Sequence, residues 1–247
     1  MRLKEITRHV IDFCYPGVCA SCNGASEGRC PLCEPCDSDL HALEIAPSCE
    51  KCGMPLAQDE APCAYCTGSG VHPFKRIARL GIFVDPLKHL IHQLKYHRRW
   101  NLAEFFADRL LEQEKVRQIL ESADCIVPVP LHLLRQVARG YNQADVIARR
   151  VAAVQKIRLA NPVSRLKRTE TQTHLSHTKR IENMRDAFGL RDPAAVHDKH
   201  VVVIDDVMTT GATLQAIGRS IKQGQPASIS AIVIAVADPK QRGFEAI

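Results

Sequence analysis

The sequence predicts an α/β protein in which a parallel sheet with helices on both faces follows a small cysteine-rich domain. Ten of the eleven cysteines lie between residues 14 and 66, so the composition changes near residue 70. Beyond that point strand-like and helix-like patterns alternate, and the uninterrupted apolar run VVVI at 201–204 is typical of a strand buried on both faces. We therefore expect a cysteine-rich domain at residues 1–70 and an α/β domain at residues 71–247.

The overall composition limits the class of protein. With 45% hydrophobic residues, a chain of 247 residues can form a substantial core. The net charge of +6 and the pI of about 8.8 suit an anionic ligand such as a phosphate or a nucleic acid but require neither. No apolar run approaches the roughly 18 residues of a transmembrane helix, and the N-terminus lacks the apolar region of a signal peptide. We therefore expect a cytoplasmic protein that does not insert into a membrane.

The cysteines form four CxxC pairs with a repeated spacing. Ten residues separate the first pair from the second, and ten separate the third from the fourth. Two residues between thiolates let both face one ion, so two such knuckles on facing hairpins would complete a tetrahedral zinc site. Free or redox-active cysteines are the alternative, but clustered pairs without an export signal favour metal binding. The expected zinc ligands are Cys19, Cys22, Cys33 and Cys36 in one ribbon and Cys49, Cys52, Cys63 and Cys66 in the other.

The ligand set of the first ribbon stays open at this point. Cys30 offers a rival knuckle with Cys33, and Cys14 is either a core residue or an alternative ligand. Gly53 directly follows the third knuckle, where a positive φ often lets backbone amides point at the thiolates. Because four thiolates leave no open coordination position, we expect Zn²⁺ to be structural, in one or two sites. So small a head, with few large apolar side chains, would barely fold without metal.

The second domain reads as a succession of strands and helices. Apolar residues at 87, 90, 91 and 94 recur at helical spacing, and prolines at 128 and 130 end a short strand. Residues 165–185 carry six lysines or arginines against two acids and predict a mobile basic segment. In chain order, the other predicted elements are a strand at 76–84, a helix at 85–97, a helix at 102–120, a strand at 124–130, a loop entering a helix at 133–154, a strand at 200–206, a helix at 212–224 and a strand at 227–238.

The polar face of the predicted helix at 85–97 is basic. A solvated face is the favoured interpretation, and a face turned toward an anion is the alternative. Tyr96 and Trp100 could stack on a nucleobase, but aromatic residues at a helix end belong more often to the core. The basic side chains of this face are Lys88, His89, Lys95, His97 and Arg98.

Two adjacent acids follow the buried strand. Because ligands of parallel sheets bind at the carboxyl ends of strands, Asp205 and Asp206 stand at the mouth of a site. Burying two neighbouring carboxylates costs free energy unless they bind ligand hydroxyls, a metal with its waters, or cations. The next residues enter a helix whose first amides and threonine hydroxyls suit an anion, and Gly211 permits close approach. Together these features describe a ribose 5-phosphate site. The expected ligand-binding residues are Asp205, Asp206, Val207, Met208, Thr209, Thr210, Gly211, Ala212 and Thr213.

The motif VVVIDDVMTTGAT resembles the signature that binds 5-phosphoribosyl 1-diphosphate (PRPP) in type I phosphoribosyltransferases. The stretches LKYH, VPVPLHLLRQVARGYNQADVIA and RTETQTHLSHTKRIENMRDAF, with the four knuckles, are similar to the ComF family over nearly the whole chain. In that family a double zinc ribbon precedes a type I phosphoribosyltransferase domain. The resemblance implies a Mg²⁺-dependent transfer of the phosphoribosyl group of PRPP to an unidentified acceptor amine.

The same resemblance implies an alternative role, in DNA uptake during natural transformation. Single-stranded DNA would then lie along the basic stretches at 88–99 and 165–185. Proteins of the competence machinery are possible partners under this interpretation. The two roles need not exclude each other.

The resemblance also implies roles for individual residues. Asp205 and Asp206 would be catalytic, together with Arg139 as a cation near the pyrophosphate. The basic segment offers further cations in Lys167, Arg168, Lys179 and Arg180.

The turn after the strand at 124–130 fits the place where related enzymes bind pyrophosphate through main-chain amides. Strand termination is the alternative for its prolines. For residues 141–143 the resemblance implies a functional role, and helix capping and surface packing are the alternatives. The residues of the turn are Pro128, Val129 and Pro130, and the second group is Tyr141, Asn142 and Gln143.

Overall fold

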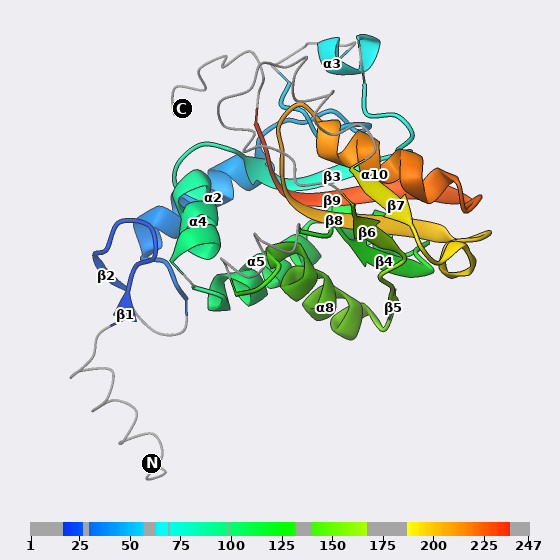
Figure 1. The fold of residues 1–247 in the computed structure, drawn as a ribbon. Coiled ribbons are helices and arrows are strands. Elements are labelled where there is room, and N and C mark those ends of the chain that lie inside the picture. Colours follow the sequence, from blue (N-terminus) through cyan, green and yellow to red (C-terminus); the bar gives the residue numbers. More distant parts are fainter. Residues whose placement is uncertain are drawn as a thin grey trace.

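A five-stranded parallel sheet forms the centre of the protein (Figure 1). The computed structural model describes residues 17–26, 30–56, 63–68, 70–97, 99–131, 140–166 and 187–237. Every neighbouring pair of strands in the sheet is parallel, and β8 is the middle strand. This confirms the predicted parallel sheet with VVVI at its centre. The strand order is β3 (Ile77–Ile82), β9 (Ser228–Val236), β8 (His200–Met208), β4 (Cys125–Pro128) and β5 (Arg158–Leu159).

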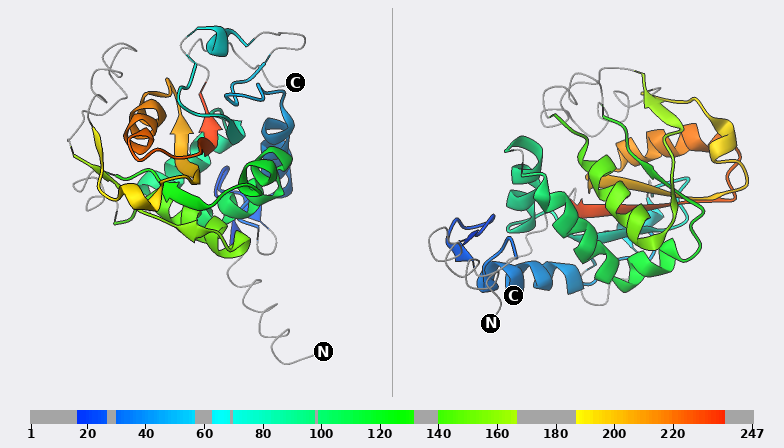
Figure 2. Two further views of the ribbon diagram at one scale, coloured as in Figure 1. Left: turned by 90° about the vertical axis from the view of Figure 1, so that its right-hand side faces the viewer. Right: turned by 90° about the horizontal axis from the view of Figure 1, so that it is seen from below.

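Helices cover both faces of the sheet (Figure 2). Val202 and Ile204 of β8 join one apolar core, and Val201 and Val203 join the other. A strand buried on both faces needs no polar alternation, which explains the run VVVI. The second core contains α10 (Ala212–Lys222). The first contains α4 (Leu87–Tyr96), α5 (Asn101–Glu112), α6 (Glu114–Leu120) and α8 (Gln143–Gln155).

The single helix predicted at 102–120 is wrong, because α5 and α6 are separate. Gln113 between them has an extended backbone with ψ 126°. Leu110 and Val116 are both fully buried in the same core, although residues six positions apart lie on different faces of a continuous helix. The break turns the second helix so that both side chains reach that core.

A short antiparallel pair flanks most of the basic segment. β6 (Val163–Arg165) pairs with β7 (Phe188–Leu190), and the 3₁₀ helix η2 (Pro193–Ala195) follows. Residues 167–186, on which the prediction of a mobile basic segment rests, lie outside the described residues. Within the described ranges, none of the helices combines the length and the apolar character that crossing a lipid bilayer requires.

The cysteine-rich head packs closely on the sheet. Its longest element, α2 (Glu34–Ile45), lies against β3, and Leu40 of α2 shares a core with Leu80 of β3. Residues of the head also enter the core on the other face, since Met54 belongs to the same core as the buried side chains of α10. The smaller elements of the head are β1 (Gly17–Val18), β2 (Ala25–Ser26) and α3 (Ala64–Thr67).

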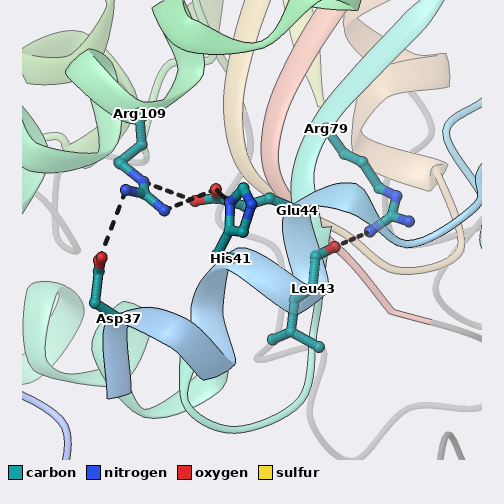
Figure 3. A network of polar contacts seen from close by, with 6 residues as sticks. All are labelled: Asp37, His41, Leu43, Glu44, Arg79 and Arg109. Atoms are coloured by element: carbon teal, nitrogen blue, oxygen red, sulfur yellow. Dashed lines mark hydrogen bonds and ion pairs between the residues drawn. The ribbon is translucent and has the colours of Figure 1, made fainter. Parts of the chain in front are cut away.

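Two arginines of the sheet domain hold α2 in place (Figure 3). The Arg109 guanidinium donates two hydrogen bonds of 2.8 Å to the Glu44 carboxylate, whose side chain is 2% exposed. Arg79 of β3 donates to the carbonyls of Leu43 (3.4 Å) and Ala46 (3.1 Å) at the end of α2. The last carbonyls of a helix lack intrahelical donors, so Arg79 acts as their cap.

We expect Arg109→Ala to lower the free energy of unfolding by about 3 kcal/mol, because it leaves the buried Glu44 carboxylate without its cation. Urea unfolding followed by circular dichroism measures the change. Arg117→Ala is the matched control, since its partner Glu114 is 64% exposed and exposed ion pairs contribute little. Equal effects of the two substitutions would contradict a structural role for the Arg109–Glu44 pair.

Candidate functional site

Asp205 and Asp206 lie in β8 just beyond the point where the neighbouring strand β4 ends. Ile204 is paired with Pro128, the last residue of β4, so both acids lie beyond the end of that neighbouring strand. The strand itself continues two residues further than predicted, because Val207 and Met208 still pair with β9. The acids therefore have a strand partner on one side only.

A lysine from α4 faces these acids. Lys95 Nζ lies 2.9 Å from Asp206 Oδ1, and the two side chains are only 18% and 16% exposed. The favoured interpretation of the basic face on α4 as solvated is thus wrong for Lys95, which faces an anion. The Tyr141 hydroxyl donates to the Leu94 carbonyl and so ties the end of α4 to the segment that enters α8.

The second carboxylate, that of Asp205, is hydrogen-bonded to the backbone of its neighbour. Asp205 Oδ1 accepts a hydrogen bond of 2.8 Å from the Asp206 amide. Burial, with a smaller contribution from the Asp206 charge, raises the pKa of Asp205 to about 7. The pair thus holds one lysine-compensated carboxylate and one acid that titrates near neutral pH, both able to accept ligand hydroxyls.

We expect Asp205→Asn to stabilise the protein, and by more at pH 8 than at pH 5. The pKa of Asp205 in the folded protein, about 7, lies above its ordinary value of 3.8, so folding favours the protonated acid. The contribution of Asp205 to the free energy of unfolding is fully present below pH 3.8 and is lost as the pH rises toward 7. Asparagine does not titrate and so avoids this loss. Thermal unfolding between pH 5 and pH 8 tests the prediction, and a difference that does not change with pH would contradict it.

The loop after β8, residues 209–211, leads into the start of a helix. Gly211 has a φ of 73° and precedes α10, whose first amides, like those of every helix, lack intrahelical acceptors. The Thr210 hydroxyl accepts a 3.4 Å hydrogen bond from the Ala212 amide. The side chains of Met208 and Ala212 are buried in the core, so these two residues could contact a ligand only through their backbone.

Hydrogen bonds within the protein engage the backbone amide and carbonyl of Val129, the central residue of the turn at 128–130. β4 ends at Pro128, as strand termination predicts. Prolines have no amide hydrogen, and the Val129 amide donates to the Ile204 carbonyl (2.9 Å). The Asn142 side chain donates to the Val129 carbonyl (3.0 Å), and its oxygen caps α8 by accepting from Ala144. Amides for a pyrophosphate would therefore have to come from residues beyond Pro130.

The other predicted residues are exposed or lie outside the described part of the chain. The expectation that Tyr96 and Trp100 belong to the core is wrong, since they are 57% and 61% exposed. Trp100 stands between α4 and α5 and so belongs to the apolar face of neither helix. The candidate cations Arg139, Lys167, Arg168, Lys179 and Arg180 lie outside the described residues.

The head contains two groups of four cysteines with the dimensions of zinc sites. In each group the sulfur atoms lie within 4.8 Å of one another. The pairs Cys22–Cys33, Cys52–Cys63 and Cys49–Cys66 have Sγ–Sγ distances of 3.6, 3.7 and 3.8 Å. A zinc–sulfur bond of about 2.3 Å gives edges of about 3.8 Å in a tetrahedron, whereas a disulfide requires about 2.05 Å. Both groups thus fit a tetrahedral zinc ion.

The cysteines of each group are the ones that the CxxC spacing predicts. Cys33 belongs to the first group and the exposed Cys30 does not, while Cys14 lies outside the described residues. The groups are Cys19, Cys22, Cys33 and Cys36, and Cys49, Cys52, Cys63 and Cys66.

Both groups share one construction, which differs in part from the predicted facing hairpins. In the first group the first knuckle lies in the turn between β1 and β2. In the second group it lies in the turn closed by the Ser48–Pro55 bridge. The second knuckle lies at the start of a helix, since Cys33 and Cys63 are the N-caps of α2 and α3. Gly53 has the predicted positive φ, 69°. A repeated unit of turn and helix start therefore builds both sites.

One residue at the loop was missed from the sequence. Tyr65, between Cys63 and Cys66, donates from its hydroxyl to the Thr210 carbonyl (2.9 Å). Its place between two cysteines gives no sign of a partner 145 residues away.

Comparisons with known proteins agree with this architecture. A family model described as "Phosphoribosyl transferase domain" matches residues 111–246. DNA utilization protein YhgH of Salmonella typhimurium is 32% identical over 222 residues, which cover 87% of this chain and 94% of the relative. Competence protein F of Haemophilus influenzae is 30% identical over 215 residues, covering 83% and 90%. Competence protein ComFC of Bacillus subtilis is 32% identical over 113 residues, covering 44% and 43%. With its two four-cysteine groups ahead of a phosphoribosyltransferase domain, the chain belongs to the ComF family.

Proposed function

We propose that the protein binds PRPP with Mg²⁺ at the end of β8 and transfers the phosphoribosyl group to an acceptor amine. The observation that carries the proposal is the pair of partly buried acids, Asp205 and Asp206, directly before the Gly211 turn into α10. Ribose offers two hydroxyls to these acids while its 5-phosphate faces the first amides of the helix. The family supports this assignment, because its model is a phosphoribosyl transferase domain.

In this reaction the bond between C1 of the ribose and the diphosphate oxygen breaks, and a bond from C1 to the amine nitrogen forms. The amine loses a proton, and pyrophosphate leaves with the electron pair of the broken bond. The protein contributes positioning through the two acids and the loop. Mg²⁺ would enter with PRPP and compensate the charge of the diphosphate. Arg139 and the lysines and arginines of the basic segment are the proposed protein cations.

Titration calorimetry of the full chain with PRPP, with and without Mg²⁺, tests the binding step. We expect a saturable heat that depends on Mg²⁺ and is competed by ribose 5-phosphate. Absence of any heat would refute the proposal. Pyrophosphate release on addition of candidate amines then tests turnover.

Single-stranded DNA binding is a second proposed function. Relatives are named as a DNA utilization protein and a competence protein, and Tyr96 and Trp100 are exposed, with Lys95 and Arg99 beside them in the sequence. Exposed aromatic rings among cations suit base stacking along a phosphate backbone. Affinity for a single-stranded oligonucleotide should then fall steeply with added salt, and Trp100→Ala should weaken it. Binding that is insensitive to salt would argue against this function.

A further inference from the structure

The helix between two cysteines of the second group contacts the loop at residues 209–211, which we call the phosphate loop. α3 contains Tyr65, and its hydroxyl donates to the Thr210 carbonyl at 2.9 Å. The side chain is partly buried, and Thr210 is 6% exposed, so water is largely excluded from this contact. Tyr65 lies two residues after Cys63 and one before Cys66, both members of the group.

The head makes three neighbouring contacts with the phosphate loop and the first turn of α10. Besides the Thr210 carbonyl, the Cα of Gly211 lies so close that a Cβ there would be 2.6 Å from the Tyr65 hydroxyl. One turn into α10, the Gln215 side chain donates to the Gly70 carbonyl at 3.0 Å. The head thus contacts the loop, and not only the outer surface of the helix.

The hydrogen bond determines where a ligand-facing amide points. A peptide unit is planar and trans, so the Thr210 carbonyl and the Gly211 amide that follows it point in opposite directions. Holding the carbonyl toward Tyr65 aims the Gly211 N–H away from the head. Glycine tolerates many backbone conformations, so this peptide unit could rotate at little cost without an anchor. Tyr65 supplies the anchor.

We propose that Tyr65 is a positioning residue for the phosphate loop and that metal at Cys49, Cys52, Cys63 and Cys66 holds it there. The proposal rests on the proposed PRPP function for the identity of the ligand. α3 has four residues, which is too short for a helix stable by itself. Coordination of the cysteines on both sides of Tyr65 would fix the backbone that carries it. The first group lies in the other core, so the coupling belongs to the second group alone.

The test compares Tyr65→Phe with Thr67→Val in the full-length, zinc-loaded protein. Thr67 lies in the same short helix, and among the described residues its hydroxyl donates only to the carbonyls of Cys63, the N-cap, and Ala64. For Tyr65→Phe we expect unchanged zinc content, faster amide exchange confined to residues 207–214, and PRPP binding weakened about three- to tenfold, as for the loss of one hydrogen bond. For Thr67→Val we expect wild-type exchange at 207–214 and wild-type affinity.

Amide exchange is measured without ligand, so it decides the positioning role separately from PRPP binding. Unchanged exchange at 207–214 in Tyr65→Phe would overturn the inference, as would loss of zinc or faster exchange spread over the whole protein. If the wild-type protein fails to bind PRPP, the proposed function falls while the exchange result still stands for or against Tyr65. Wild-type PRPP affinity in Tyr65→Phe, with the wild-type protein binding normally, would overturn the inference.

Discussion

Substituting Asp205 and Asp206 together with asparagine is expected to weaken PRPP binding by roughly thirtyfold. Hydrogen bonds to a charged acceptor contribute about 1 kcal/mol more than those to a neutral one, and two such bonds to ribose hydroxyls are affected. Asparagine is isosteric, so the sheet register at β8 and the loop should remain. Titration calorimetry with PRPP and Mg²⁺ measures the change.

The matched control is Asp124→Asn. Asp124 accepts a hydrogen bond from the His200 amide at the opposite end of β8, far along the strand from the proposed ligand. We expect this variant to bind PRPP like the wild-type protein. If the double asparagine variant also bound normally, the acids would not hold the ribose, and the site would have to be placed elsewhere.

Loss of the second metal site is expected to have the largest effect on stability. Cys52 is 1% exposed, and Cys52→Ser removes one of four thiolates around the proposed zinc ion. Zinc binding stabilises small ribbons by about 10 kcal/mol, and losing even 4 kcal/mol of this lowers the melting temperature of a domain of this size by about 10 °C. Thermal unfolding and zinc content by mass spectrometry measure the effect.

Cys30→Ser is the control for this experiment. Cys30 is exposed and lies outside both cysteine groups, so its substitution should leave zinc content and melting temperature unchanged. A Cys52→Ser protein with the zinc content and the melting temperature of the wild-type protein would show that the Cys52 thiolate is not needed to hold metal.

The sequence predicts best those features that depend on residues close together along the chain. The run VVVI identifies the central strand because burial on both faces leaves no polar alternation. The CxxC spacing predicts the ligand set of the second group, since a knuckle is a local structure, whereas the rival Cys30 leaves the first set open until the structure assigns it. The positive φ of Gly211 follows from the turn into α10.

Features that depend on distant partners could not be predicted in this way. Periodicity places Lys95 on the polar face of a helix, but it does not say that this face meets Asp206. Trp100 lies between two predicted helices, but the apolar pattern does not say whether a residue at that place packs into the core or stays exposed. Tyr65 has no pattern of its own at all, and only the tertiary fold brings it to Thr210.

The separation of 145 residues between Tyr65 and Thr210 also bears on how the chain is made. At about 5–20 residues per second, a ribosome needs on the order of 10 s to synthesise the stretch between them. During that time the newly made head presents Met54 and Leu40 without the strands and helix that later cover them. We therefore expect nascent chains stalled before β8 to bind holdase chaperones, and completed chains, which contain β8, α10 and β9, to escape them.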